Sequence, residues 1–394
     1  MFVNRKKYGE LKQLMEYDEI IVLTGMRRVG KTTLLKQLYN EVKSGNKVFL
    51  DMENQTDRML FDEKDYNNIW NNLMSFNITK SEKAYIFLDE IQLAPQIISP
   101  LKYLYDHYNV KFITTGSSSF YLKNLFSESL SGRKFILELF PLDFEEFLWF
   151  KGINISFEEE FQAKEKQRNR VFYEKHKALY DEYLQFGGFP QVVLAGTQDQ
   201  KERYLKDIFN SYFEKDVKSL ADFRNISGFR ELLLLLIKRT GSKLDVSKLA
   251  SALNLSRPTI YSYLSFLEQT YFISLVNAFS KSIDREISRS KKVYLCDTGI
   301  INIFRNIDEG SLFENAVFNN LKLYGKINYF QNRSSSEIDF ILPEKRVALE
   351  VKNKAIPQHI QRLKRLSTAL NIDEYYVISK EFADLEHVIL SVNL

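Results

Sequence analysis

Short apolar runs alternate with longer amphipathic stretches along the first 150 residues. Apolar runs of this length predict buried strands, and the stretches between them predict helices packed on a parallel sheet. We therefore expect an α/β domain with a parallel sheet over residues 1–150. The predicted strands are Glu19–Thr24, Lys47–Leu50, Ala84–Leu88 and Lys111–Thr115, and the helix after the first strand is Thr32–Lys43.

The pattern changes near residue 151, where charged residues become dense. Glu158–Lys177 contains no glycine or proline and predicts one exposed helix. A turn is predicted at Phe186-Gly187-Gly188-Phe189-Pro190, inside an otherwise helical region. We expect a helical lid or linker over residues 151–227.

A helix-turn-helix pattern follows. Its first helix is predicted over Asp245–Leu253, with Asp245 as N-cap, and its second begins after Ser256-Arg257-Pro258, because serine caps helices and proline suits their first turn. Spacings of four, three and four predict the buried face of the second helix, which leaves other side chains available to solvent or to a DNA groove. The predicted buried residues are Ile260, Leu264, Leu267 and Tyr271, and the available ones are Arg257, Thr259, Tyr261, Ser262 and Ser265.

Two further runs, Phe272–Ala278 and Val293–Leu295, predict a hairpin after these helices. The connection Ser280–Lys292 holds five basic and two acidic residues. Helix-turn-helix followed by a basic hairpin predicts a winged helix over residues 228–292. Winged helices also serve as packing modules, so the pattern indicates the fold more firmly than it indicates DNA binding.

Strands return over residues 293–394, where we expect a C-terminal α/β domain. A predicted helix, Pro357–Leu370, separates the last two strands. The other expected strands are Ile327–Phe330, Ile338–Leu342, Val347–Val351 and Tyr375–Ile378.

Composition narrows the class of protein. Apolar residues make up 44% and charged residues 27% of the chain, which is ordinary for globular proteins. The longest apolar run, Leu232–Ile237, is too short to span a bilayer, and the N-terminus has no apolar signal segment, so we expect a cytoplasmic protein with no membrane partner. One cysteine and four histidines argue against cysteine or histidine metal sites. The net charge of +4 requires any nucleic-acid surface to be a local patch.

The segment from Gly25 to Thr32 fits the G-x-x-x-x-G-K-[ST] pattern between a predicted strand and a predicted helix. Glycines let backbone N–H groups turn toward phosphates at a helix N-terminus. Lys31 is expected to contact the outer phosphates of ATP, and the Thr32 hydroxyl to bind Mg²⁺. The predicted nucleotide-binding residues of this segment are Gly25, Arg28, Val29, Gly30, Lys31, Thr32 and Thr33.

Two carboxylates, Asp89 and Glu90, end the third predicted strand, at the sheet edge where ligands bind in open α/β folds. Asp89 is expected to hold the Mg²⁺ shell, and Glu90 to activate the attacking water as general base. Thr115 or Ser117, which end the next strand, could lie between this water and the γ-phosphate, although an ordinary Ser/Thr turn explains them equally well.

Arg133 follows Leu130-Ser131-Gly132 and is a candidate arginine finger, acting on the nucleotide of a neighbouring chain in a homo-oligomer. A structural salt bridge is the alternative.

These segments resemble a widespread prokaryotic family of AAA-type ATPases that carry a C-terminal domain of unknown function. The resemblance covers nearly the whole chain and implies ATP binding and hydrolysis, without a settled cellular role. The segments that carry it are Gly25–Thr33, Leu88–Gln92, Thr115–Ser119, Leu130–Arg133, Phe140–Leu142, Glu145–Phe147, Gly187–Pro190 and Tyr294–Gly299.

The C-terminal domain brings acids to a predicted hairpin. Asp339 lies in its first strand, and Glu350 and Lys352 share one face of the second. Mg²⁺ between Asp339 and Glu350, with Lys352 orienting a hydroxide, would explain these charges in apolar strands, and Glu314 in an apolar helix could complete the metal shell. Together they resemble the PD-(D/E)XK nuclease superfamily; a nuclease-like scaffold or a surface ion pair is the alternative.

Three interpretations remain open from the sequence. One is an ATPase that acts on DNA and carries a Mg²⁺-dependent nuclease domain. The second is a nucleotide-gated signalling switch whose C-terminal domain binds a partner. The third is a DNA-binding ATPase whose nuclease-like fold is a non-catalytic clamp. Glu90 favours hydrolysis over binding alone, and the intact pair Glu350 and Lys352 favours a nuclease over a clamp.

Overall fold

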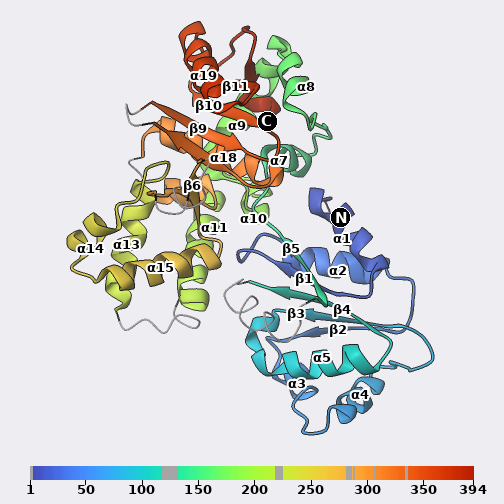
Figure 1. The fold of residues 1–394 in the computed structure, drawn as a ribbon. Helices are drawn as coiled ribbons and strands as arrows, with labels where there is room; N and C mark the ends of the chain where they lie inside the picture. Colours follow the sequence, from blue (N-terminus) through green and yellow to red (C-terminus); the bar gives the residue numbers. More distant parts are fainter. Residues whose placement is uncertain are drawn as a thin grey trace. The chain divides into compact units, whose positions relative to one another are not determined.

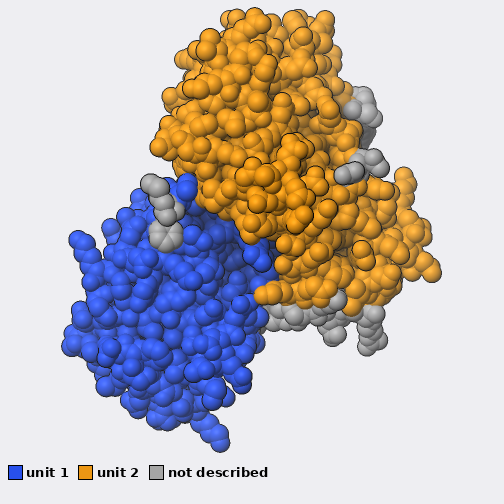
Figure 2. Space-filling model, turned by 180° about the vertical axis from the view of Figure 1, so that it is seen from behind, with its two compact units in different colours: residues 1–140, 269–271 blue, residues 141–268, 272–394 orange. Residues whose placement is uncertain are grey.

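The computed structural model describes residues 3–117, 132–217, 225–280, 286, 289–304, 307–332 and 336–394. The chain divides into two compact units, drawn in different colours in Figure 2. Unit 1 contains residues 1–140 with 269–271, and unit 2 contains residues 141–268 with 272–394. In the ranges given above, no helix has both the length and the apolar character needed to cross a membrane.

Unit 1 is a five-stranded parallel sheet with helices on both faces (Figure 1). The parallel α/β sheet expected from the sequence is confirmed. In sheet order, the strands are β2 (Lys47–Asp51), β3 (Ala84–Asp89), β4 (Val110–Gly116), β1 (Ile20–Thr24) and β5 (Lys134–Glu138). The helices are α1 (Lys6–Gln13), α2 (Lys31–Glu41), α3 (Gln55–Met59), α4 (Tyr66–Met74) and α5 (Ile98–His107).

Burial explains why the central strands could be predicted from the sequence. Every residue of β1 and β4 is buried, as expected for strands covered on both faces. The edge strand β5 was not predicted, although Phe135–Leu137 is a short apolar run; only Leu137 of its five residues is buried, and Ile136 is 41% exposed.

Unit 2 combines a helical region with a seven-stranded mixed sheet. In sheet order, the strands are β12 (Val388–Leu390), β11 (Glu374–Ser379), β10 (Val347–Lys352), β9 (Glu337–Leu342), β8 (Asn328–Gln331), β6 (Ile273–Ala278) and β7 (Lys292–Leu295). The helices are α7 (Phe144–Phe150), α8 (Phe161–Lys166), α9 (Arg170–Phe186), α10 (Pro190–Val193), α11 (Gln198–Ser211), α13 (Ile226–Lys238), α14 (Val246–Leu253), α15 (Arg257–Gln269), α17 (Thr298–Ile303), α18 (Glu309–Leu321) and α19 (Pro357–Leu370).

The two faces of this sheet have separate cores. Phe340 and Leu349 pack in one cluster with Phe313 of α18. Ile341 and Ala348 pack in another with Leu363 of α19. Helix α19, which connects the parallel strands β10 and β11, therefore covers the face of the sheet opposite to α18.

Two sequence predictions about helices were wrong. Glu158–Lys177 is not one exposed helix: the Asn169 side chain accepts the Phe172 N–H and starts a new helix, α9, whose far end is buried. The second helix of the helix-turn-helix ends at Gln269, so Tyr271 is not on its buried face. Tyr271 has φ +62° and donates to Glu138 Oε1 at 3.0 Å, while Tyr263 and Phe266 extend the buried face of α15.

Helices α13, α14 and α15 precede the antiparallel pair of β6 and β7. Lys243, between α13 and α14, forms a bridge with Lys292 of β7. Strand β6 also pairs in parallel with β8, so this hairpin is part of the seven-stranded sheet rather than a free ribbon. Much of the predicted basic connection between the two strands, including Lys281 and Arg285, lies outside the described residues.

A buried carboxylate joins two segments that the sequence marked. Asp297 accepts the Gly188 N–H at 2.6 Å and the Gly299 N–H at 2.8 Å, and caps α17. A Cβ at Gly187, which has φ +74°, would lie 2.0 Å from Asp297 Oδ1, so only glycine fits there. The predicted turn at 186–190 is therefore held against the start of α17.

Asp297 should make the stability of unit 2 pH-dependent. Burial raises the pKa of Asp297 to about 6, and the backbone N–H groups only partly oppose this. Because the folded pKa exceeds that of the unfolded chain, the stabilisation is present below about pH 4 and is lost as the pH rises through 6, by about 3 kcal/mol. Asp297→Asn should lack this dependence. Denaturant titrations from pH 4 to 7 check it: a wild-type minus variant difference that stays constant would contradict it.

Candidate functional site

The loop between β1 and α2 has the backbone that the sequence pattern requires. Gly25 has φ +145°, and a Cβ there would lie 2.0 Å from the Leu139 carbonyl oxygen. Arg28 and Gly30 also have positive φ, of 68° and 101°. Lys31 begins α2, is buried, and donates through Nζ to the carbonyl oxygens of Gly25 and Met26, both at 2.9 Å. Its ammonium therefore lies over the loop that is expected to hold phosphate.

Arg5, which precedes α1, fixes this loop from outside the sequence pattern. Its buried guanidinium donates to the Val29 carbonyl at 2.7 Å and to the Phe140 carbonyl at 2.8 Å. Arg5 could not be predicted as part of the site, because nothing in the local sequence distinguishes it from the lysines that follow.

Asp89 lies at the carboxyl end of β3 beside two hydroxyl groups. Thr32 Oγ1 donates to Asp89 Oδ1 at 3.1 Å, and the Thr115 hydroxyl donates to the same oxygen. Burial raises the pKa of Asp89, and the two threonine hydroxyls oppose that rise. A threonine hydroxyl next to a carboxylate is the donor set that Mg²⁺ takes beside nucleotide phosphates. Thr32 and Asp89 therefore fit the predicted Mg²⁺ role.

Glu90 is held in an uncommon backbone conformation, with φ +54° and ψ +45°. Its N–H donates to Thr115 Oγ1 at 3.0 Å, so the Thr115 hydroxyl links Asp89 and Glu90. The Glu90 carboxylate accepts a hydrogen bond from Gln92 and lies 3.8 Å from Arg27 Nη1. Strained backbone at the end of a strand is typical of functional sites.

Gln92 and Arg27 are site residues that the sequence analysis did not assign. Gln92 Nε2 also donates to Ser117 Oγ at 2.9 Å, and the Ser117 N–H donates back to Gln92 Oε1 at 3.3 Å. The predicted Ser117 thus orients Glu90 through Gln92. The Asp-Glu-x-Gln order at 89–92 was visible, but its meaning depends on β4 lying beside β3.

Arg133 lies just before β5, at the end of the sheet opposite to the phosphate loop. Its carbonyl accepts the Ile20 N–H at 2.8 Å, at the start of β1, and its Nε pairs with Asp106 Oδ1 at 3.0 Å. The five residues of β1 span about 16 Å between this end and the loop at Gly25. Arg133 therefore does not contact the nucleotide site of its own chain, and its ion pair with Asp106 agrees with the structural alternative, while a role toward a neighbouring chain stays a prediction.

The predicted C-terminal residues come together, but with cations between them. Lys352 Nζ lies 3.0 Å from Glu350 Oε1 and 4.0 Å from Asp339 Oδ2, and Arg362 of α19 also pairs with Glu350 Oε1. Asp339 Oδ2 accepts the Val351 N–H at 2.8 Å. Glu350 is fully buried.

Glu314 belongs to a second part of this cluster, centred on Lys292. The Lys292 ammonium lies 3.1 Å from Glu314 Oε1 and 3.9 Å from Asp339 Oδ1, and it also pairs with Glu337. Burial lowers the pKa of Lys292, but the three surrounding carboxylates outweigh it and raise that pKa. Burial and the charge of Asp339 raise the pKa of Glu314.

Within the described ranges, no three acidic, histidine or cysteine side chains converge so as to hold a metal ion. The prediction also placed Lys292 among the basic residues of the connection Ser280–Lys292 that could contact DNA phosphates. This was wrong, because Lys292 is a buried β7 residue surrounded by carboxylates.

The predicted DNA-facing side of α15 is on the surface. Arg257, Tyr261 and Ser262 are exposed, with Tyr261 at 60%. Ile260, Leu264 and Leu267 are buried, as predicted. A large aromatic side chain and an arginine exposed on one helix can contact bases and phosphates, respectively.

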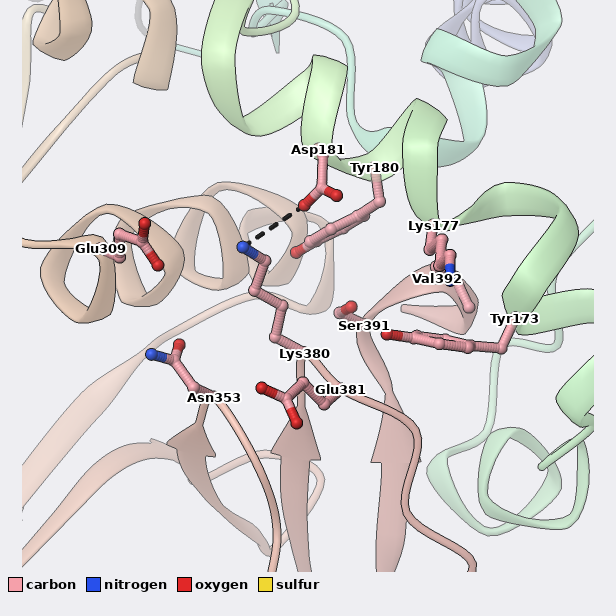
Figure 3. Close-up of a pocket in the computed structure, with 10 residues that line it drawn as sticks. All are labelled: Tyr173, Lys177, Tyr180, Asp181, Glu309, Asn353, Lys380, Glu381, Ser391 and Val392. Atoms are coloured by element: carbon pink, nitrogen blue, oxygen red, sulfur yellow. Dashed lines mark ion pairs between the residues drawn. The ribbon is translucent and has the colours of Figure 1, made fainter.

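A polar pocket of about 200 Å³ opens in unit 2 beside the carboxyl ends of β10, β11 and β12 (Figure 3). Lys380 reaches across it to Asp181, at 3.3 Å, while Lys177 and Glu381 lie on other sides (Figure 3). Because the lining carries charges of both signs, it favours neither an anionic nor a cationic ligand.

The parallel sheet, the phosphate loop and the acids after β3 define a P-loop ATPase domain of the AAA type. The family described as "AAA domain" matches residues 17–148, and a domain of unknown function, DUF8612, matches residues 177–311. The chain belongs to the family of the uncharacterized protein MJ1544 of Methanocaldococcus jannaschii, to which it is 31% identical over 338 residues, covering 82% of this chain and 72% of that protein.

The chain is also similar to a bacterial relative and to a solved structure. An uncharacterized protein of Haemophilus influenzae is 27% identical over 353 residues, covering 86% of this chain and 83% of the relative. Among solved structures, the Walker-type ATPase PABY2304 of Pyrococcus abyssi shares 14% identity at a TM-score of 0.48, over 77% of this chain and 96% of that one.

Proposed function

We propose that this protein binds and hydrolyses ATP in unit 1 and acts on DNA through residues 228–292, which we interpret as a winged helix. The observation that carries hydrolysis is the placement of Glu90. Its carboxylate lies beside the Mg²⁺-binding position at Asp89 and is oriented by Gln92 and Arg27. A protein that only bound ATP would not need an acid held in this way.

Each residue of the phosphate site in unit 1 has a separate role in the proposed hydrolysis. Backbone N–H groups of the loop and the N-terminus of α2 bind the phosphates, and Lys31 leaves its loop carbonyls to pair with the outer ones. Thr32 and Asp89 would hold Mg²⁺, which neutralises phosphate charge when bound. Glu90 then accepts a proton from the attacking water. Arg27, close to Glu90, can pair with the γ-phosphate.

Exposed positive and aromatic side chains on α15 support the DNA part of the proposal. The bridge between Lys243 and Lys292 also supports it, since it pairs a third segment of the chain with the β6–β7 hairpin. A DNA partner would bind mainly through phosphate contacts, as a nearly neutral chain with a local basic patch allows.

A Mg²⁺-dependent nuclease is the second candidate activity for the C-terminal domain. The order α18, β8, β9, β10, α19, β11 and the closeness of Asp339, Glu350 and Lys352 support a nuclease-like fold. The cations that pair with each acid favour the other interpretation, in which the domain is a non-catalytic scaffold.

Phosphate release by the purified full chain tests the proposal. We expect Mg²⁺-dependent hydrolysis of ATP, and a change in its rate when duplex DNA is added. Absence of nucleotide binding would contradict the role of unit 1. ATP hydrolysis without any DNA binding would instead leave an ATPase with a signalling role.

Arg133 predicts a concentration dependence. If it stabilises phosphoryl-transfer charge on a neighbouring chain, ATPase activity per chain should rise with protein concentration, and Arg133→Ala should lower the plateau by about 10³-fold. Asp106→Ala is the matched control, because it removes only the ion-pair partner of Arg133. Activity that is independent of concentration across the range in which oligomers dissociate would assign Arg133 to a structural ion pair.

A further inference from the structure

The acidic cluster of unit 2 is balanced by positive side chains of the same chain. The carboxylates are Glu314, Glu337, Asp339 and Glu350, and the cations within 4.0 Å of them are Lys243, Lys292, Lys352 and Arg362. Four negative and four positive charges leave no net charge for a metal ion to neutralise. A divalent cation placed there would give the cluster a net charge of about +2.

Lys292 occupies the position among the acids that a cation requires. Its ammonium touches Glu337 and lies 3.1 Å from Glu314 Oε1, and its side chain is only 4% exposed. Lys292 is buried in β7, where its residue pairs with Val276 of β6, so its ammonium lies among these acids rather than in solvent. The Tyr294 hydroxyl adds a bond to Glu314 Oε1 at 2.6 Å, so that oxygen already has two donors.

The other carboxylates of the cluster also have partners within the chain. Asp339 has the Val351 N–H on one oxygen and Lys292 near the other. Glu350 Oε1 faces Lys352 and Arg362, and only its buried Oε2 accepts no hydrogen bond from the described residues. Mg²⁺ requires an octahedral set of oxygen ligands, whereas here each acid already faces at least one cation of the same chain. The residues therefore do not fit the metal that the nuclease resemblance implies.

We propose that Lys292 takes the place of the divalent cation in this cluster, so that the C-terminal domain keeps its acids together without a metal. The ammonium joins β7, β9 and α18, and so ties the hairpin after the helix-turn-helix to the nuclease-like strands. This deepens the scaffold interpretation of the domain and is independent of ATP hydrolysis in unit 1.

Removing the internal cation should create a metal site. The test is a calorimetric titration of Mn²⁺ into nucleotide-free, full-length protein, since P-loop sites hold such ions mainly through bound phosphates. The acidic cluster of wild type should bind no Mn²⁺, so Asp339→Asn should leave the Mn²⁺ titration unchanged. Lys292→Met, which keeps the aliphatic volume but leaves the acids unbalanced, should bind Mn²⁺ at least about tenfold more tightly. Adding Asp339→Asn to Lys292→Met should abolish the gain.

Two controls separate charge from fold. Lys291→Met changes the neighbouring residue, which is more exposed and outside the acidic cluster, and should gain nothing. Lys292→Arg keeps the charge and should not gain Mn²⁺ either. If Lys292→Met does not fold alone, refolding with Mn²⁺ should recover it, because the metal can then take the role of the ammonium.

Three results would overturn the proposal. They are Mn²⁺ binding by wild type that Asp339→Asn removes, a folded Lys292→Met protein without added Mn²⁺ affinity, and an unfolded Lys292→Met protein that Mn²⁺ does not rescue. ATP hydrolysis is measured on the same preparations, so a failed ATPase assignment would be seen separately.

Discussion

Replacing Lys31 with alanine should abolish detectable nucleotide binding. Lys31 begins α2 and is the lysine of the loop, with its ammonium over the carbonyls of Gly25 and Met26. Without it, the outer phosphates lose their charge-assisted partner, and we expect affinity to fall by about 100-fold or more, or ~2.7 kcal/mol. Titration with a fluorescent ATP analogue measures this. Lys36→Ala, an exposed position on the same helix, is the matched control and should bind normally.

The variant Glu90→Gln should separate binding from hydrolysis. Glutamine keeps the size of the side chain but cannot accept the proton of the attacking water, so turnover should fall by about 10³-fold while affinity for ATP persists. Single-turnover phosphate release and the same binding titration measure both. Turnover at the wild-type rate would mean that Glu90 is not the general base and that another acid near Asp89 has this role.

The strands and the phosphate loop could be predicted because their signals are local. Each predicted strand of the P-loop domain lies within one residue of β1, β2, β3 or β4, since central strands of a parallel sheet are continuous apolar runs. The glycines and Lys31 fall in one segment of eight residues, so their spacing alone indicates the chemistry. Edge strand β5 and the short β12 were missed, although each contains an apolar run of three residues.

What the sequence could not predict depends on contacts between distant segments. Arg5 reaches Val29 and Phe140, and Gln92 reaches Ser117, across separations that no local pattern encodes. Lys292 illustrates the point most clearly. In the sequence it ends a basic stretch, and only the pairing of β6 with β7 and β8 turns it inward toward the acids.

DNA binding should depend on the cations that stay exposed near the β6–β7 hairpin, which exclude the buried Lys292. With Lys292 buried, three other described cations near the hairpin and α15, namely Arg257, Arg289 and Lys291, are at least partly exposed and can reach phosphates. Replacing all three with alanine should weaken binding to every duplex sequence tested, because phosphate contacts carry no base information. Each lost contact lowers the salt slope of log K by about 0.9, so the triple variant should lose up to about 2.7 in slope and about 10³-fold in affinity near 0.1 M salt.

Fluorescence anisotropy over a range of salt concentrations measures both quantities. A control variant removes three exposed cations elsewhere, Lys64, Lys80 and Arg203, with the same change in net charge. Because the overall charge falls equally in both variants, a difference between them must come from the local surface. If both variants lose affinity equally, the attraction is non-local. If affinity and slope are unchanged in the first variant, α14 and α15 form a packing module, and the ATPase must act on a partner other than DNA.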